Sequence, residues 1–155
     1  MKSINKKHLN NSGGFKMPRN NRKKLILPDS ELQVMQIIWN MEREQNGNCI
    51  PITAGAMFEH SPEVIGHLKL TTVLTLITRL ISKGCIKAVK EGRANYYIPL
   101  IKESDYRQTA ADEFVATVYK NDTKSLISAL LGNENLSVDD IKELRKMIEG
   151  VNKGD

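Results

Sequence analysis

Residues 70–80 read LTTVLTLITRL, and this stretch decides the fold of the 155-residue chain. Its apolar residues recur at the three- and four-residue spacing of a helix, at Val73, Leu76, Ile77 and Leu80. The opposite face is polar, with Thr71, Thr72, Thr75, Thr78, Arg79 and Ser82. Gly84 stands where a left-handed residue ends a helix. The pattern therefore predicts a helix from Lys69 or Leu70 to Lys83, with a buried stripe and a polar outer face.

A short hairpin is predicted directly after this helix. Residues 85–90 and 94–98 are two β-like runs, joined by Glu91-Gly92-Arg93 and closed by Pro99. Tyr96 and Tyr97 alternate along the second run, so one packs inward and the other faces solvent or a phosphate. The turn exposes Arg93 on a loop flanked by Lys90.

Two helices are predicted before residue 70. The first spans residues 29–42 with Asp29 as its N-cap and Trp39 in its apolar stripe. Thr53 caps a short second helix that ends at Phe58 or Glu59, before Ser61-Pro62. Residues 64–68 are predicted to form a loop. Three helices followed by a hairpin is the element order of a winged helix-turn-helix.

The C-terminal third is predicted to be helical. Ser104 caps a helix of residues 105–120, a second helix covers residues 123–131, and Ser137 caps a third that ends at Glu149. The fold class is thus mainly α with a small β-hairpin wing. The predicted parts are a disordered basic tail (residues 1–24), a winged-helix domain (25–101) and a helical dimerisation domain (102–150).

The formal net charge of +5 is unevenly distributed along the chain. Residues 1–24 hold eight Lys and Arg and no acid, so the remainder is at −3. This tail has almost no periodic apolar residues, which predicts disorder. It is a solubilising leader, a stretch upstream of the true start with Met17 as initiator, or a basic arm that reaches DNA phosphates. Residues 64–101 hold six basic residues against Glu91 alone, which favours binding of nucleic acid by this block.

Composition and motifs argue against several other classes of protein. The sequence contains no stretch of 18 apolar residues, so no membrane-spanning helix is predicted. No apolar segment follows the basic N-terminus, so no signal peptide is predicted. Cys49 and Cys85 form no C-x-x-C pair, which favours a cytoplasmic protein with inert thiols. The histidines belong to no nucleophile or ligand pattern, lying in the tail (His8) or in loops (His60 and His67). We therefore expect no enzyme activity, no metal and no cofactor.

The chemistry of the 64–101 block fits recognition of double-stranded DNA. A recognition helix needs a buried stripe and an opposite face of short polar groups and cations that enters the major groove. Threonine hydroxyls can meet base edges, threonine methyls can meet thymine methyls, and Arg or Lys neutralises phosphates. A winged helix can also serve as a protein-interaction module without DNA, and this alternative stays open.

Several strings resemble the penicillinase-repressor family, of the BlaI and MecI type with copper-responsive CopY relatives. They are LPDSELQVM at residues 27–35, TVLTLITRL at 72–80, KEGR at 90–93, YY at 96–97 and ESDY at 103–106. The resemblance covers about residues 27–150 and implies a homodimeric repressor that binds a palindromic operator. The predicted DNA contacts are Lys69, Thr71, Thr72, Thr75, Arg79, Lys83, Lys90, Arg93 and Tyr96. The predicted dimer interface comprises Phe114, Val115, Val118, Leu126, Ile127, Leu130, Ile141, Leu144 and Ile148.

The chain departs from the family pattern at two regulatory features. Members that are cleaved in response to β-lactams carry an Asn-Phe bond where this chain has Ala129-Leu130. CopY-type relatives carry a C-terminal Cys-x-Cys pair, and no cysteine follows Cys85 here. The inducing protease or other signal is therefore left open, and copper sensing by that pair is excluded.

Overall fold

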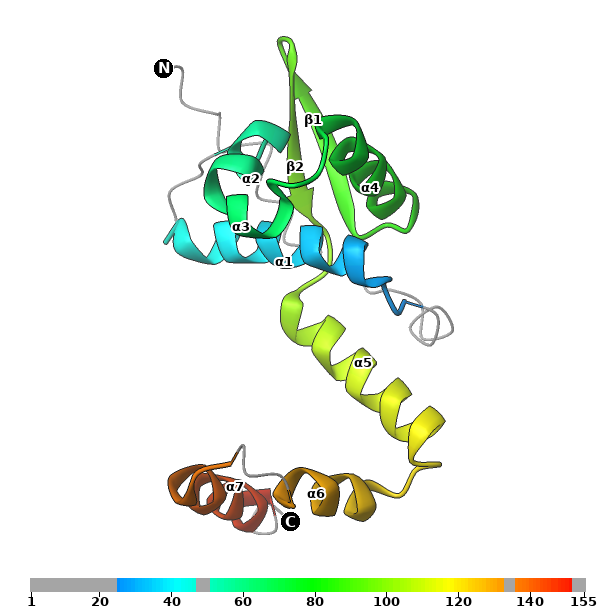
Figure 1. Cartoon of the computed structure of the whole chain (residues 1–155), viewed down its shortest axis with the longest axis vertical. Helices are drawn as coiled ribbons and strands as arrows, with labels where there is room; N and C mark the ends of the chain where they lie inside the picture. Colours follow the sequence, from blue (N-terminus) through cyan, green and yellow to red (C-terminus); the bar gives the residue numbers. More distant parts are fainter. Residues whose placement is uncertain (1–24, 47–50, 133–135, 152–155) are drawn as a thin grey trace. The chain divides into compact units, whose positions relative to one another are not determined.

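The computed structural model describes residues 25–46, 51–132 and 136–151 (Figure 1). The predicted tail of residues 1–24 and Cys49 lie outside this part. The chain divides into two compact units, Met1–Ala110 and Ala111–Asp155, and each is described by itself.

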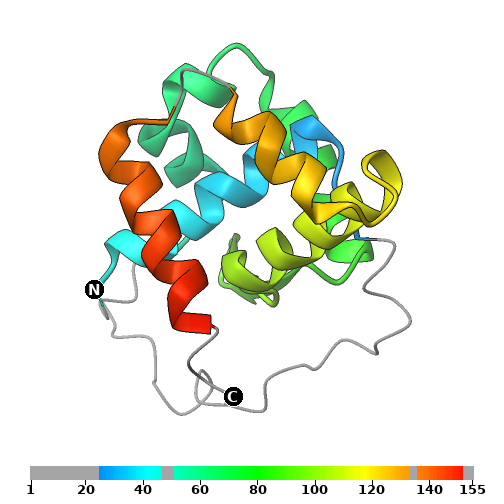
Figure 2. The same cartoon turned by 90° about the horizontal axis from the view of Figure 1, so that it is seen from below.

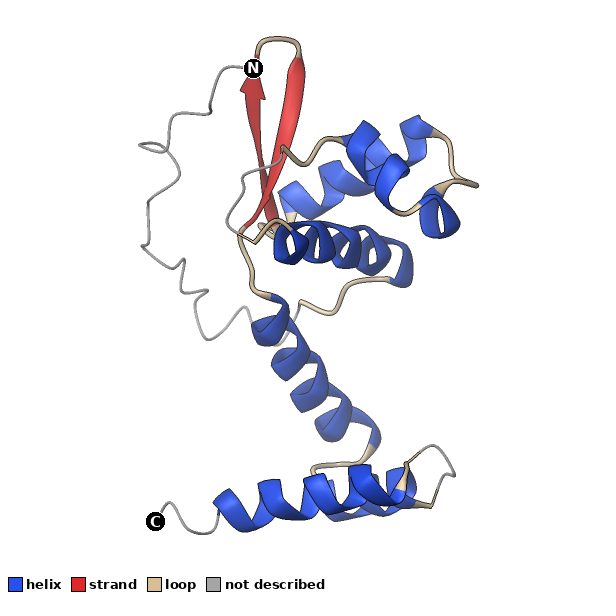
Figure 3. Cartoon of the chain, turned by 90° about the vertical axis from the view of Figure 1, so that its left-hand side faces the viewer, coloured by secondary structure: helices blue, strands red, loops and turns tan. Residues whose placement is uncertain are grey.

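The first unit has the predicted helix-helix-helix-hairpin order with one additional short helix. Figure 3 shows the hairpin as a long two-stranded antiparallel ribbon beside the helices. In its register Ile86 pairs with Pro99, and Glu91 pairs with Ala94 next to the turn. The elements of this unit are α1 (Asp29–Glu44), α2 (Ala54–His60), α3 (Pro62–Ile65), α4 (Leu70–Ser82), β1 (Ile86–Glu91) and β2 (Ala94–Pro99), followed by the beginning of α5 (Glu103–Val118).

Local signals explain where most of these helices begin and end. The Thr53 hydroxyl caps α2 by accepting a hydrogen bond from the Ala56 N–H at 3.1 Å, as predicted. Gly84 follows α4 with φ of 74°, which confirms the left-handed position predicted for it. The predicted N-cap at Asp29 is wrong, because α1 begins at Asp29 and Pro28 holds the cap position without a side-chain hydrogen bond. Asp29 instead lies in the first turn, where its carboxylate interacts favourably with the helix dipole.

Two other predicted boundaries are also wrong. The residues around Val64 form a helix, α3, because Pro62 occupies a first-turn position where its missing N–H costs nothing. Ser104 lies inside α5, which begins one residue earlier at Glu103.

The core of the first unit joins α1 to α4 and the hairpin. Its largest fully buried side chains come from the four helices α1 to α4, from β1 and from the residue before β1: Val34, Met35, Ile38, Met57, Ile65, Val73, Ile77, Leu80, Cys85 and Ile86. The beginning of α5 packs on α1, where the Trp39 and Tyr106 rings lie 5.6 Å apart. The Trp39 indole N–H donates to the Ile101 carbonyl at 2.9 Å, and the Leu27 N–H donates to the Tyr106 hydroxyl at 3.1 Å. These contacts hold the beginning of α5 on α1.

The second unit contains α6 (Thr123–Leu131) and α7 (Val138–Val151), drawn in orange and red in Figure 2. The Asp122 carboxylate caps α6 by accepting from the Ser125 N–H at 3.1 Å. Ser137 and Asp140 form a reciprocal cap for α7, which confirms the predicted Ser137 cap. Hydrogen bonds from the Ser125 hydroxyl and N–H lower the pKa of Asp122, and those from the Ser137 hydroxyl and N–H lower the pKa of Asp140. No described residue of α6 or α7 is buried, so local caps rather than a core define these helices.

Candidate nucleic-acid interface

The α4 helix presents the predicted polar face outward. Its four apolar stripe residues are at most 5% exposed, so the rotation of the helix about its axis is set by the core. Thr71, Thr72, Thr75 and Arg79 are all exposed on the other side. Lys69 is exposed at the N-cap position, immediately before the first turn. The structure therefore brings these five predicted contacts together on one element.

Hydroxyl groups on this face bond back to the helix itself. The Thr75 hydroxyl donates to the Thr71 carbonyl at 2.9 Å, and the Thr78 hydroxyl donates to the Leu74 carbonyl at 2.9 Å. The Ser82 hydroxyl continues the row by donating to the Thr78 carbonyl at 3.0 Å. Thr78 and Ser82 were not among the predicted contacts, although the helical spacing already places them on the same face.

Lys83 differs from the other cations of the predicted set because it has an ion-pair partner on α1. Its ammonium forms an ion pair with the Glu31 carboxylate of α1, and that carboxylate is only 3% exposed. A buried carboxylate needs such a partner, because without one it has lost its hydration and gained no compensating interaction. Lys83 therefore attaches the C-terminal end of α4 to α1 instead of extending a free charge toward a phosphate. A partner 52 positions away gives no signal in the local sequence.

The hairpin places its turn and its cations in exposed positions. Gly92 has φ of 62°, as the first position of a two-residue primed turn requires, and Arg93 beside it is exposed. Tyr97 is the inward tyrosine, at 5% exposure, and Tyr96 is half-buried, which confirms the predicted alternation. Strand pairing joins Lys90 to Asn95 and Val89 to Tyr96, so Lys90 and Tyr96 lie on opposite faces of the ribbon.

Lys87, which is not among the predicted contacts, is a further cation on the hairpin. It is exposed on β1 and lies two residues from Val89, the partner of Tyr96. Lys87 and Tyr96 therefore share one face of the wing. The inward direction of Tyr97 leads to the same result. Its partner on β1 is Ala88, and side chains alternate along a strand, so Lys87 points to the opposite face from Tyr97.

The described residues offer little for catalysis or metal binding. Burial raises the pKa of the Cys85 thiol to about 11, so Cys85 stays protonated and unreactive near neutral pH. His60 ends α2 instead of lying in a loop as predicted, and its Nε2 contacts the Glu44 carboxylate at 2.8 Å. Among residues 25–46, 51–132 and 136–151, no group of three or more His, Cys, Asp or Glu is placed to hold a metal ion. None of the helices described there is long and apolar enough to cross a membrane.

The predicted interface residues of the second unit lie on exposed apolar faces. Phe114, Val118, Ile127, Leu130, Ile141, Leu144 and Ile148 are each at least 40% exposed. Val115 and Leu126 are half-buried. Four more residues extend these faces beyond the predicted set: Leu131, Val138, Met147 and Val151.

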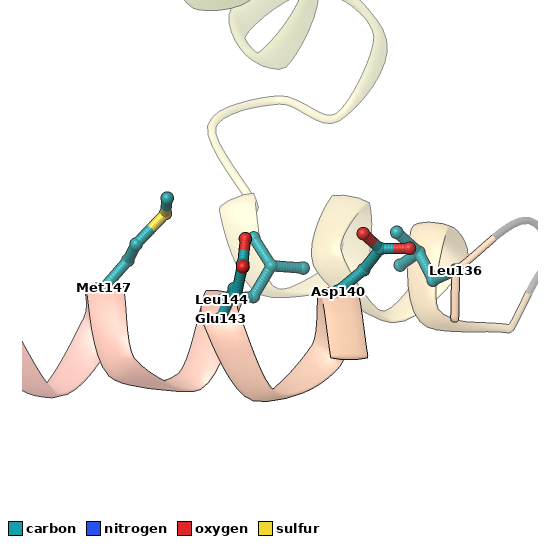
Figure 4. A pocket seen from close by; sticks show the side chains of 5 residues that line it. All are labelled: Leu136, Asp140, Glu143, Leu144 and Met147. Atoms are coloured by element: carbon teal, nitrogen blue, oxygen red, sulfur yellow. The ribbon is translucent and has the colours of Figure 1, made fainter. Parts of the chain in front are cut away.

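Along α7 a shallow hollow of about 200 Å³ is lined by Leu136, Asp140, Glu143, Leu144 and Met147 (Figure 4). All five residues come from α7 or from the residues just before it. The hollow is therefore a feature of one open helix surface.

Comparison with known proteins assigns the family. The family model described as penicillinase repressor matches residues 27–150. The chain belongs to this family. It is 32% identical to the penicillinase repressor of Bacillus licheniformis over 79% of this chain and 89% of that protein. It is 34% identical to the methicillin resistance regulatory protein MecI of Mammaliicoccus sciuri over 79% of this chain and 92% of the relative.

A solved structure is also similar to part of this penicillinase-repressor family member. It is the solution structure of the monomeric form of Bacillus licheniformis BlaI in complex with the blaP half-operator. The sequence identity is 32%, the match covers 52% of this chain and 88% of BlaI, and the TM-score is 0.40. The family is one of transcriptional repressors, which are not enzymes.

Proposed function

We propose that this chain is a sequence-specific transcriptional repressor that binds double-stranded operator DNA through α4 and the hairpin wing. The observation that carries this proposal is the exposed polar face of α4, held above an almost fully buried stripe. A helix fixed in this way can enter a major groove with its first turns facing the bases. In this proposal Lys69, Thr71, Thr72, Thr75 and Arg79 contact the DNA from α4, and Lys90, Arg93 and Tyr96 contact it from the wing. Lys83 is left out, because Glu31 occupies its charge.

The repressor acts as a homodimer in this proposal. The described residues of α6 and α7 include none that is buried, whereas several large apolar side chains of each helix are exposed. Exposed apolar surface on this scale marks an interaction site. A symmetric dimer presents two copies of α4, which matches a palindromic operator with two half-sites.

Similar proteins support the choice of DNA over protein as the partner. The solved relative at 32% identity is described as bound to a half-operator, and curated relatives are named as repressors. The alternative function, a winged-helix protein-interaction module, leaves the basic charge of residues 64–101 without a role. A repressor of this kind acts in the cytoplasm.

Induction is proposed to differ from cleavage at an Asn-Phe bond. Ala129 and Leu130 occupy that position in this chain, and both are exposed on α6. The inducing protease or signal therefore has to recognise something else.

A mobility-shift experiment with the full chain tests the proposal. The probes are the DNA upstream of its own coding region and a scrambled duplex of equal length, each at low and at moderate salt. We expect both probes to bind at low salt and only the upstream DNA to bind as salt rises, since phosphate contacts weaken with salt for every sequence. Failure to bind either duplex at low salt would favour the protein-interaction module.

A further inference from the structure

The exposed surface of α4 consists of three chemically different stripes. The central stripe is formed by hydroxyl residues one helical turn apart: Thr71, Thr75, Thr78 and Ser82. On one side of it lies an apolar stripe, with Leu70, Leu74 and Ile81 between 37% and 52% exposed. On the other side lie Thr72 and Arg79. We use the names hydroxyl stripe, apolar stripe and cation stripe for these three surfaces.

Three of the four hydroxyl protons of the hydroxyl stripe are already used inside the helix. Thr75, Thr78 and Ser82 each donate to the carbonyl four residues earlier, at 2.9–3.0 Å. A hydroxyl group has one proton and two lone pairs. When the proton points back to the helix, the lone pairs remain for groups in front of it. The outer hydroxyls of α4 are therefore arranged to accept hydrogen bonds.

Each base pair shows a different pattern in the major groove, so an accepting surface discriminates among bases. Adenine N6 and cytosine N4 are donors, and thymine adds a methyl group. Guanine presents only the N7 and O6 acceptors on its own edge, which need a donor such as Arg or Lys. The first two turns of α4, from Leu70 to Leu76, carry no Arg, Lys, Asn or Gln. Its only Arg, Arg79, lies in the third turn.

We infer that the hydroxyl and apolar stripes of α4 read adenine and cytosine amino groups and thymine methyls, and do not read guanine. This inference rests on the proposed function and specifies the base chemistry of the half-site. Thr75 is the central specificity residue, because it is exposed, its proton is bonded to the Thr71 carbonyl, and it lies within the first two turns. Leu74 provides the neighbouring apolar contact for a thymine methyl.

The experiment begins with selection of bound sequences by the full chain from a randomised 30-base-pair duplex pool at moderate salt. Each base of the enriched half-site is then replaced by an analogue that lacks one group. Deoxyuridine removes the thymine methyl, purine deoxyriboside removes the adenine N6 amino group, and 7-deazaguanine removes the guanine N7. We expect at least one deoxyuridine to weaken binding about fourfold, as for one buried methyl. Purine deoxyriboside should weaken it about fivefold at one adenine, as for one hydrogen bond.

Two variants of Thr75 assign these effects to the hydroxyl stripe. Thr75→Val keeps the shape and a methyl but removes the acceptor, so it should eliminate the fivefold effect of purine deoxyriboside. Thr75→Ser keeps the acceptor but removes the methyl, so it should retain that effect. Thr109→Val is the matched control, because the Thr109 hydroxyl makes the same 2.9 Å bond to a carbonyl four residues earlier on α5. It should leave all analogue effects unchanged.

The outcomes separate the inference from the proposed function. If the pool yields no bound duplex even at low salt, the proposed function fails. If a half-site is enriched but Thr75→Val removes sensitivity to 7-deazaguanine, Thr75 donates to guanine and the inference is overturned. If neither Thr75 variant changes any analogue effect, the inference is overturned while the repressor function remains.

Discussion

The two units of the chain use the same helical pattern with opposite results. In α4 the stripe residues Val73 and Leu80 are completely buried. In α7, Ile141, Leu144 and Ile148 repeat at the same three- and four-residue spacing, yet each is 40–55% exposed. The first unit therefore obtains its stability from burial within one chain. The second unit leaves a comparable apolar surface uncovered, and this is the surface that the proposed dimer would remove from water.

The largest expected effect comes from a charge in the exposed stripe of the second unit. Leu144→Asp places a carboxylate in the proposed interface, where it is desolvated without a partner. We expect complete loss of the dimer, measured as a halved mass in light scattering. Lys146→Asp, on the polar side of α7, introduces the same carboxylate with a larger change of charge and should leave the mass unchanged. A Leu144→Asp protein that keeps the dimer mass would move the interface to another surface.

The next effect concerns the buried stripe of the first unit. Leu80→Ala removes a completely buried side chain and leaves a cavity, which lowers the free energy of unfolding by about 2–5 kcal/mol. Urea denaturation followed by circular dichroism measures this change. Leu74→Ala on the exposed side of the same helix should cost less than about 0.5 kcal/mol. Equal losses for the two variants would show that α4 is oriented differently.

A smaller effect is expected at the ion pair that joins α1 to the end of α4. Lys83→Met leaves the buried Glu31 carboxylate without its partner. It should lower the free energy of unfolding by about 2 kcal/mol, since hydrogen bonds to charged groups contribute at this level. Glu31→Gln should cost less, because Lys83 is 38% exposed and can turn to solvent. The two unfolding free energies, measured under the same conditions, test this order. A larger loss for Glu31→Gln would contradict the structural role given to Lys83.

The smallest effects are expected from alanine substitutions at two glycines, one from each unit. A Cβ added at Gly92 or at Gly150 meets no atom within 4 Å, so only the backbone distinguishes the two sites. Gly92→Ala should cost about 1 kcal/mol, because φ of 62° disfavours any residue with a Cβ. Gly150→Ala, within α7, should stabilise the protein by up to about 1 kcal/mol, since alanine favours a helix. Thermal unfolding should show a lower midpoint temperature for Gly92→Ala and a higher one for Gly150→Ala. Midpoints that shift in the same direction would refute this distinction.

Local patterns predicted most of the fold correctly. Helices α4 and α6 were predicted from the sequence. Gly84 was correctly predicted to end α4, and Thr53 was correctly predicted to cap α2. Cap positions with more than one acceptable residue were less predictable. Asp29 suits both an N-cap and a first turn, and Pro62 can either end a helix or begin one, so both were assigned to the wrong role.

Contacts between distant residues account for what the sequence did not predict at the candidate site. Lys83 resembled the other cations of the basic block until its partner Glu31, on α1, was known. The face that Lys87 shares with Tyr96 was not predicted, because it depends on the register of the two strands. The inward-bonded hydroxyl protons of Thr75 and Thr78 depend on side-chain rotamers, which a helical pattern alone does not specify.

The sequence by itself determined the order of the helices and the hairpin apart from α3, the amphipathic faces, the concentration of basic charge in residues 64–101 and the family resemblance. These properties follow from residue spacing and local backbone preferences, which act over a few positions. Only the tertiary structure decided that the α4 stripe is covered and the α7 stripe is open, and that the Lys83 charge is neutralised by Glu31. Burial and ion pairing depend on which distant segments meet, because the free energy comes from removing both surfaces from water together.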